Sequence, residues 1–230
     1  MHPTAMTNSK QFFDCYIPFI RSDQCARVVE IGSKDVNGSI RRNCPSEFDY
    51  VGVDFEPGKG VDVVLADPYT LPFEDGSADM VVSSSCFEHC EMFWLVFLEI
   101  MRVLKPHGLF YLNVPSNGGF HRYPVDCWRF YPDSGGALVT WARRNGMNAM
   151  LLESYTSTQV GDKWNDFVTV FLKDQAQAAR YPNRILDSKD DYNNGLTDRS
   201  KDLLHFSPMP EDQRKMQAIA EIIGNKFKIA

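Results

Sequence analysis

The stretch Arg27-Val-Val-Glu-Ile-Gly-Ser-Lys-Asp-Val-Asn-Gly38 decides the fold of this chain. A short β-branched run ends at Ile31 and is followed at once by Gly32. Such a run is typical of a buried parallel strand, and a glycine directly after it lets the backbone approach a ligand closely. We predict a strand over residues 27–31 and a helix that begins near Gly38. Glu30 at the strand's end suits a ligand with hydroxyls or a positive charge better than a bare pyrophosphate, which needs unopposed N–H groups.

Taken alone, this stretch leaves two interpretations open. The dinucleotide-binding fingerprint Gly-x-Gly-x-x-Gly is absent, because Lys34 and Asn37 occupy the positions of its later glycines. A buried strand with an ordinary turn would show the same residues. The order of the segments that follow favours a ligand-binding strand.

Short apolar runs and helical patterns alternate along the chain. Apolar spacing predicts helices over residues 9–21, 91–103, 133–145 and from 211 onward, and strands over residues 27–31, 50–54, 61–67, 79–83, 109–115, 150–157 and 166–172. Alternation of this kind indicates βαβ units and a parallel sheet, whose ligands bind beyond the carboxyl ends of the strands.

Four polar side chains follow these strands where each one ends: Glu30, Asp54, Asp67 and His89. The carboxyl ends of parallel strands meet at one edge of the sheet, so we expect the four to gather there. Asp54, 24 residues after Glu30, stands where α/β nucleotide sites hold ribose hydroxyls. A turn-forming role explains an isolated aspartate equally well.

The composition limits the classes of function. The 230 residues, 43% of them hydrophobic, are enough for one domain with a full core. A net charge of −6 argues against nucleic acid as a partner. The six cysteines form no Cys-x-x-Cys pair and no zinc spacing, so we expect reduced thiols, no metal and a cytoplasmic protein. No apolar run is long enough to cross a membrane, so no membrane association is expected.

Several motifs in order resemble the class I S-adenosylmethionine-dependent methyltransferases, in particular their small-molecule branch. The resemblance covers residues 27 to about 150 and rests on Val-Glu-Ile-Gly, Tyr-Val-Gly-Val-Asp54, Leu-Ala-Asp67, Phe87-Glu-His89 and Glu99-Ile-Met-Arg-Val-Leu-Lys-Pro-His-Gly108. It implies an α/β, Rossmann-like fold: a seven-stranded, mostly parallel sheet with helices on both faces and an antiparallel last strand.

The same resemblance implies S-adenosyl-L-methionine as cofactor, S-adenosyl-L-homocysteine as product, and roles for single residues. Glu30 would lie near the ammonium of the methionine part, Asp54 would hold the ribose, and Asp67 would reach the adenine amino group. The remaining cofactor-binding residues would be Gly32, Ser33, Phe55, Pro68, Ser84 and Ser85. Lys34 and Val36 replace two glycines of the family's turn, and the short spacing to the second strand implies a short first crossover helix.

A loop over residues 116–133 is rich in aromatic and polar side chains. Such a loop at the ligand end of a sheet is typical of a substrate pocket. The expected substrate-binding residues are His121, Arg122, Tyr123, Trp128 and Arg129. In the alternative interpretation, the aromatic side chains only pack on the sheet and Asp126 forms a structural ion pair with Arg129.

Three side chains are candidates for a general base, which methyl transfer to a hydroxyl would need. His89 is the first, because it follows the fourth strand where the methyl group is expected, and an ordinary histidine pKa of about 6.5 suits the role. His121 is the second and Asp126 the third. His89 could instead be a helix-start histidine bonded to the backbone.

The predicted organisation is a methyltransferase domain over residues 1–173 and a polar extension over 174–230 that ends in an amphipathic helix. This helix either docks on its own domain or forms a dimer contact, so the protein is expected to be a monomer or a homodimer. The favoured function is methyl transfer to a small polar acceptor with a hydroxyl group. A catalytically inactive methyltransferase-like binding or scaffold protein is the alternative. A nucleic-acid methyltransferase is disfavoured by the net charge.

Overall fold

A computed structural model describes residues 1–20, 25–159, 164–208 and 211–227. Its helices, strands and 3-10 turns are, in chain order, α1 (Pro3–Tyr16), η1 (Ile17–Phe19), β1 (Arg27–Ile31), η2 (Ile40–Asn43), β2 (Asp49–Asp54), β3 (Val63–Val64), β4 (Ala78–Ser84), η3 (Phe87–His89), α2 (Phe93–Val103), β5 (Leu104–Pro115), α3 (Ser134–Arg144), β6 (Met150–Ser157), β7 (Asp166–Leu172), η4 (Gln175–Arg180), η5 (Ile185–Asp187), β8 (Tyr192–Thr197), β9 (Ser200–Leu204) and α4 (Glu211–Phe227).

One sheet runs through the described residues in the order β3-β2-β1-β4-β5-β7-β6-β8-β9. β1 to β5 pair in parallel, and β7 runs antiparallel to both β5 and β6. The predicted Rossmann-like fold is confirmed. The last strand predicted from the sequence, residues 166–172, is β7, and it is antiparallel as expected. The predicted number of strands is wrong: the sheet has nine strands, because β8 and β9 extend it beyond β6.

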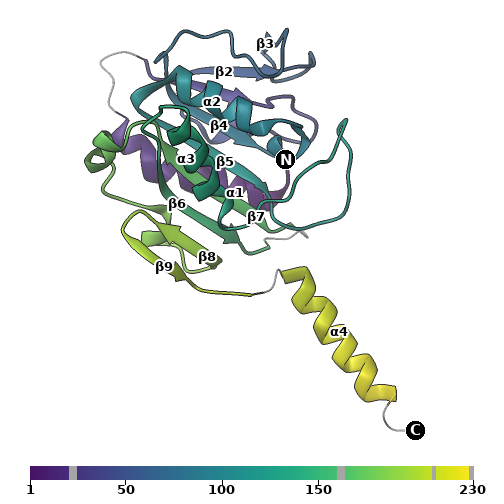
Figure 1. Ribbon diagram of the computed structural model, residues 1–230. Coiled ribbons are helices and arrows are strands. Elements are labelled where there is room, and N and C mark those ends of the chain that lie inside the picture. Colours follow the sequence, from purple (N-terminus) through teal and green to yellow (C-terminus); the bar gives the residue numbers. More distant parts are fainter. Residues whose placement is uncertain (21–24, 160–163, 209–210, 228–230) are drawn as a thin grey trace.

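Helices cover both faces of the sheet, as predicted (Figure 1). α2 and α3 pack on one face over side chains that include Val29, Ile31 and Phe110. α1 packs on the other face over side chains that include Val28 and Tyr111. Alternate residues of a strand point to opposite faces, so β1 contributes to both cores.

Several elements differ in their bounds from the sequence prediction, and β5 already begins at Leu104. α1 begins at Pro3, which suits the first turn of a helix, and so Ser9 lies within the helix instead of capping it. The first crossover is only the 3-10 turn η2, which confirms that it is short. The strand expected over residues 61–67 is limited to Val63–Val64, because only these two residues pair with β2.

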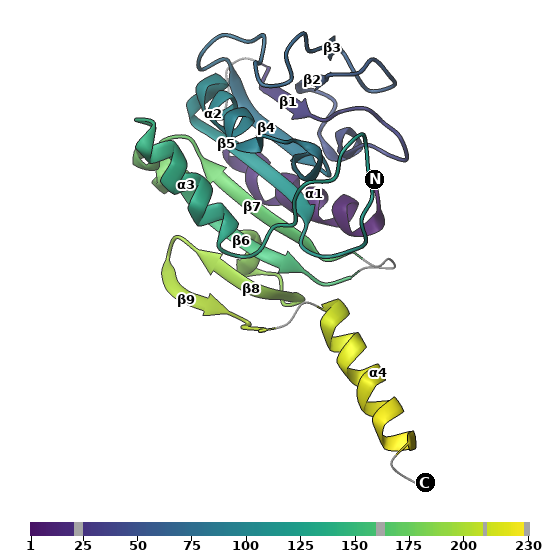
Figure 2. The same ribbon diagram turned by 45° about the vertical axis from the view of Figure 1, so that its right-hand side comes forward.

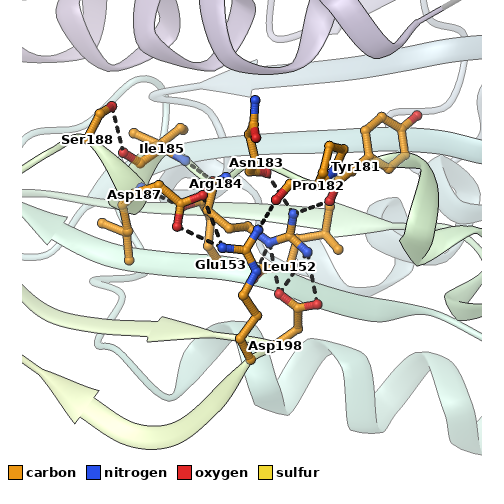
Figure 3. Close-up of polar contacts among 12 residues, drawn as sticks. Leu152, Glu153, Tyr181, Pro182, Asn183, Arg184, Ile185, Asp187, Ser188 and Asp198 are labelled. Carbon is orange, nitrogen blue, oxygen red and sulfur yellow. Dashed lines mark hydrogen bonds and ion pairs between the residues drawn. The ribbon is translucent and has the colours of Figure 1, made fainter.

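Residues 181–204 are built into the domain by a buried polar network (Figure 3). The Glu153 carboxylate on β6 accepts hydrogen bonds from the Tyr16 hydroxyl (2.6 Å) and the backbone N–H of Ile185 (2.8 Å). The buried Arg184 guanidinium donates to Asp198 at 2.8 Å and 2.9 Å. This segment therefore belongs to the same sheet and core, and the proposed boundary at residue 173 stays a prediction.

α4 extends away from the sheet in both views (Figures 1 and 2). Its apolar side chains Met216, Ile219 and Ile223 are 48–66% exposed, so the expectation that it docks on its own domain is wrong for this structure. Among the described helices, none combines the length and the apolar character needed to cross a membrane.

Candidate functional site

The turn after β1 brings the backbone close to the loop that follows β4. Gly32 has a φ of +76°, and a Cβ at this position would lie 2.6 Å from both Cβ and Sγ of Cys86. Its N–H donates to the Val53 carbonyl at 3.0 Å. Only glycine fits this conformation and this spacing, so the turn brings the ends of β1, β2 and β4 together.

Asp54 lies at the end of β2, beside this turn. Its carboxylate is 8% exposed and accepts hydrogen bonds from the backbone N–H groups of Lys34 and Glu56, each at 3.1 Å. An ionised carboxylate has about four acceptor positions, so two are left for further donors. Asp54 therefore fixes the glycine turn and also offers acceptors to a ligand.

A cavity of about 550 Å³ opens at this edge of the sheet. Ligand pockets have volumes of about 300–1,000 Å³. Of the predicted site residues, ten line it: Gly32, Asp54, Phe55, Pro68, Ser84, Ser85, His89, His121, Arg122 and Tyr123. Six do not: Glu30, Ser33, Asp67, Asp126, Trp128 and Arg129.

Glu30 lies below the cavity because residues alternate along β1. Ile31 lines the cavity, whereas the Glu30 carboxylate is 2% exposed and accepts a hydrogen bond from the Tyr50 hydroxyl at 2.9 Å. Burial raises the pKa of Glu30 to about 8. Its position near a ligand ammonium stays a prediction.

Ser33 and Asp67 also make local contacts outside the cavity. The buried Ser33 packs beneath Gly52, where a Cβ would lie 2.7 Å from the Ser33 hydroxyl oxygen. The exposed Asp67 carboxylate accepts hydrogen bonds from the Tyr69 backbone N–H and the Thr70 hydroxyl, both at 3.0 Å. This turn places Pro68 and Tyr69, rather than Asp67, on the cavity wall.

Ser84 and Ser85 leave β4 at the cavity. The Ser84 hydroxyl donates to the sulfur of Met1 at 3.2 Å and accepts from the Asn113 amide at 3.3 Å. Ser85 has a left-handed backbone, with a φ of 52°, and its N–H donates to the Asn113 carbonyl at 2.9 Å. Met1 and His2 line the same cavity. No sequence signal indicated that these two N-terminal residues reach the site.

The second half of the aromatic loop has a structural role. Trp128 packs edge-on against Phe93 and donates from Nε1 to the Cys90 carbonyl at 2.9 Å. Arg129 pairs with the Asp126 carboxylate at 2.6 Å, which lowers the pKa of Asp126 to about 2. Trp128 therefore packs on the domain, and Asp126 and Arg129 form a structural ion pair, as in the alternative interpretation of this loop.

The first half of the loop faces the cavity. His121, Arg122 and Tyr123 line it, and the Tyr123 ring lies 5.8 Å from the Lys34 ammonium. Lys34, in turn, pairs with Glu56 at 2.6 Å. The glycine turn and the loop thus meet through Lys34.

His89 and His121 lie next to one another in the cavity. Their ring centroids are 4.9 Å apart in an edge-to-face arrangement. His89 Nδ1 donates to the Val125 carbonyl at 2.5 Å, and burial lowers the pKa of His89. The backbone N–H of His121 donates to Asp126 at 2.7 Å, so Asp126 positions His121 instead of facing the cavity itself.

Glu88, which the sequence prediction did not select, lines the cavity beside His89. It is 1% exposed, and its Oε1 lies 3.8 Å from His89 Nε2. In the sequence, Glu88 is marked only by its place in the polar run after β4. The role of candidate base in that run was given to its neighbour His89.

S-adenosylmethionine fits the residues around this cavity. Asp54 has free acceptor positions for the ribose hydroxyls. The apolar side chains of Phe55, Leu65 and Tyr69 form part of the cavity wall. The close approach of Gly32 to Cys86 leaves the turn without a side chain that would fill the space.

Comparisons with known proteins agree with this description. Residues 26–112 match the family model of the methyltransferase domain. An uncharacterized methyltransferase of Mycolicibacterium gilvum is 36% identical over 75 residues, which cover 28% of this chain and 29% of the relative. The chain thus matches less than a third of the length of that curated relative.

Solved structures share the fold at low sequence identity. The 1,6-didemethyltoxoflavin-N1-methyltransferase of Burkholderia thailandensis superimposes with a TM-score of 0.57 at 14% identity, covering 74% of this chain and 79% of that one. The [4+2]-cyclase SpnF gives 0.51 at 12% identity, covering 74% and 81%. Together with the family match, these findings confirm the predicted resemblance to class I S-adenosylmethionine-dependent methyltransferases in domain type and fold.

Proposed function

We propose that this chain is an S-adenosylmethionine-dependent methyltransferase that methylates a hydroxyl of a small polar acceptor, such as a sugar or glycan unit or a secondary metabolite. One observation carries the proposal: a single cavity contains Asp54 after β2 and the pair His89–His121 on the other side of β1. A carboxylate suited to a ribose and an imidazole suited to a proton thus share one space.

The cofactor side consists of the residues that hold the ligand in place. Asp54 would accept the ribose hydroxyl protons, Phe55 and Pro68 would contact the adenine, and Ser84 and Ser85 would line the sulfonium side. When bound, the cofactor supplies a methyl group on a positively charged sulfur. The chain's contribution is to bind and orient the two partners and to exclude water.

The acceptor side supplies the base. His89 donates its Nδ1–H to the Val125 carbonyl, so its Nε2 keeps a lone pair that can take the hydroxyl proton. Burial lowers the pKa of His89, which keeps the ring neutral at pH 7. His121 is the second candidate, and Arg122 and Tyr123 would contact the acceptor. Asp126, with a pKa of about 2, is too weak a base and is proposed to position His121.

Turnover of the histidine variants tests this assignment. Acceptors are first found by incubating sugars and small phenols with labelled S-adenosylmethionine. His89→Ala is then expected to lower turnover by about 10²–10⁴-fold, with S-adenosylhomocysteine affinity unchanged. If His89→Ala and His121→Ala both keep full turnover, neither residue is a required base, and methylation of nitrogen becomes the better proposal.

A scaffold or binding protein without turnover is the second candidate. Lys34 favours it, because its side chain lines the cavity at a position where the family has glycine, and it contacts both Glu56 and Tyr123. The fold alone does not decide, since it also occurs in a [4+2]-cyclase. Failure to bind the cofactor, together with a stable complex with a purified partner, would favour this candidate.

A further inference from the structure

Three side chains with metal-ligand atoms meet at the acceptor side of the cavity. Glu88 and His89 come from η3, and His121 comes from the loop over residues 116–133. One ligand atom from each lies within 4.8 Å of the other two. His121 is distant in the sequence from the adjacent Glu88 and His89, so the three residues form no recognisable metal motif, and no metal was predicted from the sequence.

Both imidazole rings are held so that Nε2 is the available nitrogen. His89 Nδ1 lies 2.5 Å from the Val125 carbonyl oxygen. His121 Nδ1 lies 3.2 Å from the Gly119 carbonyl oxygen and 3.3 Å from Nη2 of Arg129. Histidine ligands of metals almost always donate their other ring N–H to a carbonyl or a carboxylate, which fixes the ring and its tautomer. His89 has this arrangement, and in His121 the contacts of Nδ1 likewise leave Nε2 for a ligand.

The buried Glu88 carboxylate is incompletely paired. It is 1% exposed, and its Oε2 has no hydrogen-bond partner among the described residues. Arg129, whose charge acts on Glu88, is already paired with Asp126 at 2.6 Å. Buried carboxylates are usually paired with a cation or coordinate a metal.

We propose that Glu88, His89 and His121 bind a divalent transition-metal ion. Two histidines and one carboxylate form the ligand set of metal sites that keep open coordination positions, and here those positions would face the cavity. Bonds of about 2.0–2.2 Å require the three ligand atoms to move closer together. His121 can make this movement, because its side chain is 40% exposed on a loop.

A bound ion and a proton on His89 exclude one another, because both use the Nε2 lone pair. In the metal-loaded protein the ion would lower the pKa of an acceptor hydroxyl, and the hydroxyl proton would pass to solvent water instead of to His89. This consequence rests on the proposed function. Metal binding itself does not, so its test needs neither the cofactor nor an acceptor and can fail separately.

Titration of the full chain with Co²⁺ tests the site. The protein carries no histidine tag, is stripped with a chelator, and is followed by the visible absorption of the bound ion, with Zn²⁺ as competitor. We expect one saturable site that Zn²⁺ empties. Glu88→Gln and His121→Asn are each expected to weaken Co²⁺ binding by about 100-fold or more. His121→Asn keeps the core intact, since it changes a loop side chain.

Glu74→Gln and His205→Asn are the matched controls. Both positions are exposed and outside the cavity, and asparagine tolerates the left-handed φ of 48° at His205. Neither control should change the affinity for Co²⁺. Absence of saturable binding, or equal affinities in Glu88→Gln and Glu74→Gln, would overturn the proposal.

Discussion

Replacing Asp54 by asparagine tests the two roles of its carboxylate, one in the fold and one in cofactor binding. It accepts two backbone N–H groups, from Lys34 and Glu56 at 3.1 Å each, and it is proposed to accept the ribose hydroxyls. Asparagine keeps the shape but removes the charge and turns one acceptor into a donor. Both the glycine turn and the cofactor should therefore be held less tightly.

The expected size of the effect follows from the bonds involved. Hydrogen bonds to charged groups contribute about 1.5–3 kcal/mol each. One bond to the ribose is lost and the other is weakened, so we expect a loss of about 2–3 kcal/mol, or roughly 30- to 150-fold in the dissociation constant. The free energy of unfolding of the ligand-free protein should fall by about 1–2 kcal/mol, for the backbone donor that loses its acceptor.

Equilibrium dialysis with labelled S-adenosylhomocysteine measures the affinity, and chemical denaturation measures the stability. Asp14→Asn is the matched control, because Asp14 forms an exposed pair with Lys10 on α1, far from the cavity. An Asp54→Asn variant that binds with the affinity of the wild type would refute the ribose assignment.

Three further predictions concern the rest of the molecule. Gly32→Ala combines an unfavourable φ with a contact of 2.6 Å to Cys86, so it should destabilise the protein by about 2–4 kcal/mol in chemical denaturation and abolish cofactor binding; an unchanged midpoint would contradict the packing described. The pKa of Asp126 lies at about 2, below its ordinary value of 3.8, so the carboxylate stabilises the fold above that ordinary value, and the stabilisation is lost as the pH falls toward 2. The stability deficit of Asp126→Asn should accordingly be constant from about pH 7 to 5 and shrink in denaturation curves at lower pH; a deficit that grows on acidification would be inconsistent. Deleting residues 211–230 should leave the melting temperature almost unchanged, whereas deleting residues 174–230 removes two strands and buried core side chains and should prevent cooperative melting.

The central strands could be predicted because their apolar runs are short, buried and bounded by turn residues. β8 and β9 were missed because their sequences contain no such apolar run. Asn193-Asn-Gly195 reads as a turn, yet it lies within β8, next to the edge strand β9, and only Tyr192 and Gly195 of β8 are buried. The contacts of Arg184 and Glu153 hold this edge, and contacts between distant segments leave no local pattern.

The positions of site residues were more predictable than their orientations. Asp54 and His89 were expected at strand ends, and both line the cavity. Glu30 also ends a strand, but the alternation along β1 turns it to the other face. Glu88 was missed because a glutamate beside a histidine has no distinctive signal, and its burial depends on how the distant loop over residues 116–133 packs.

Titration calorimetry of the full chain with S-adenosylmethionine and S-adenosylhomocysteine tests the central claim most directly. The cavity, with Gly32 at the turn and Asp54 beside it, predicts micromolar binding of both compounds at one site. Only the acceptor would then remain to be found. Absence of binding to either compound would contradict the account, because it would mean that Lys34 and the altered turn have removed the cofactor site, and the scaffold function would take its place.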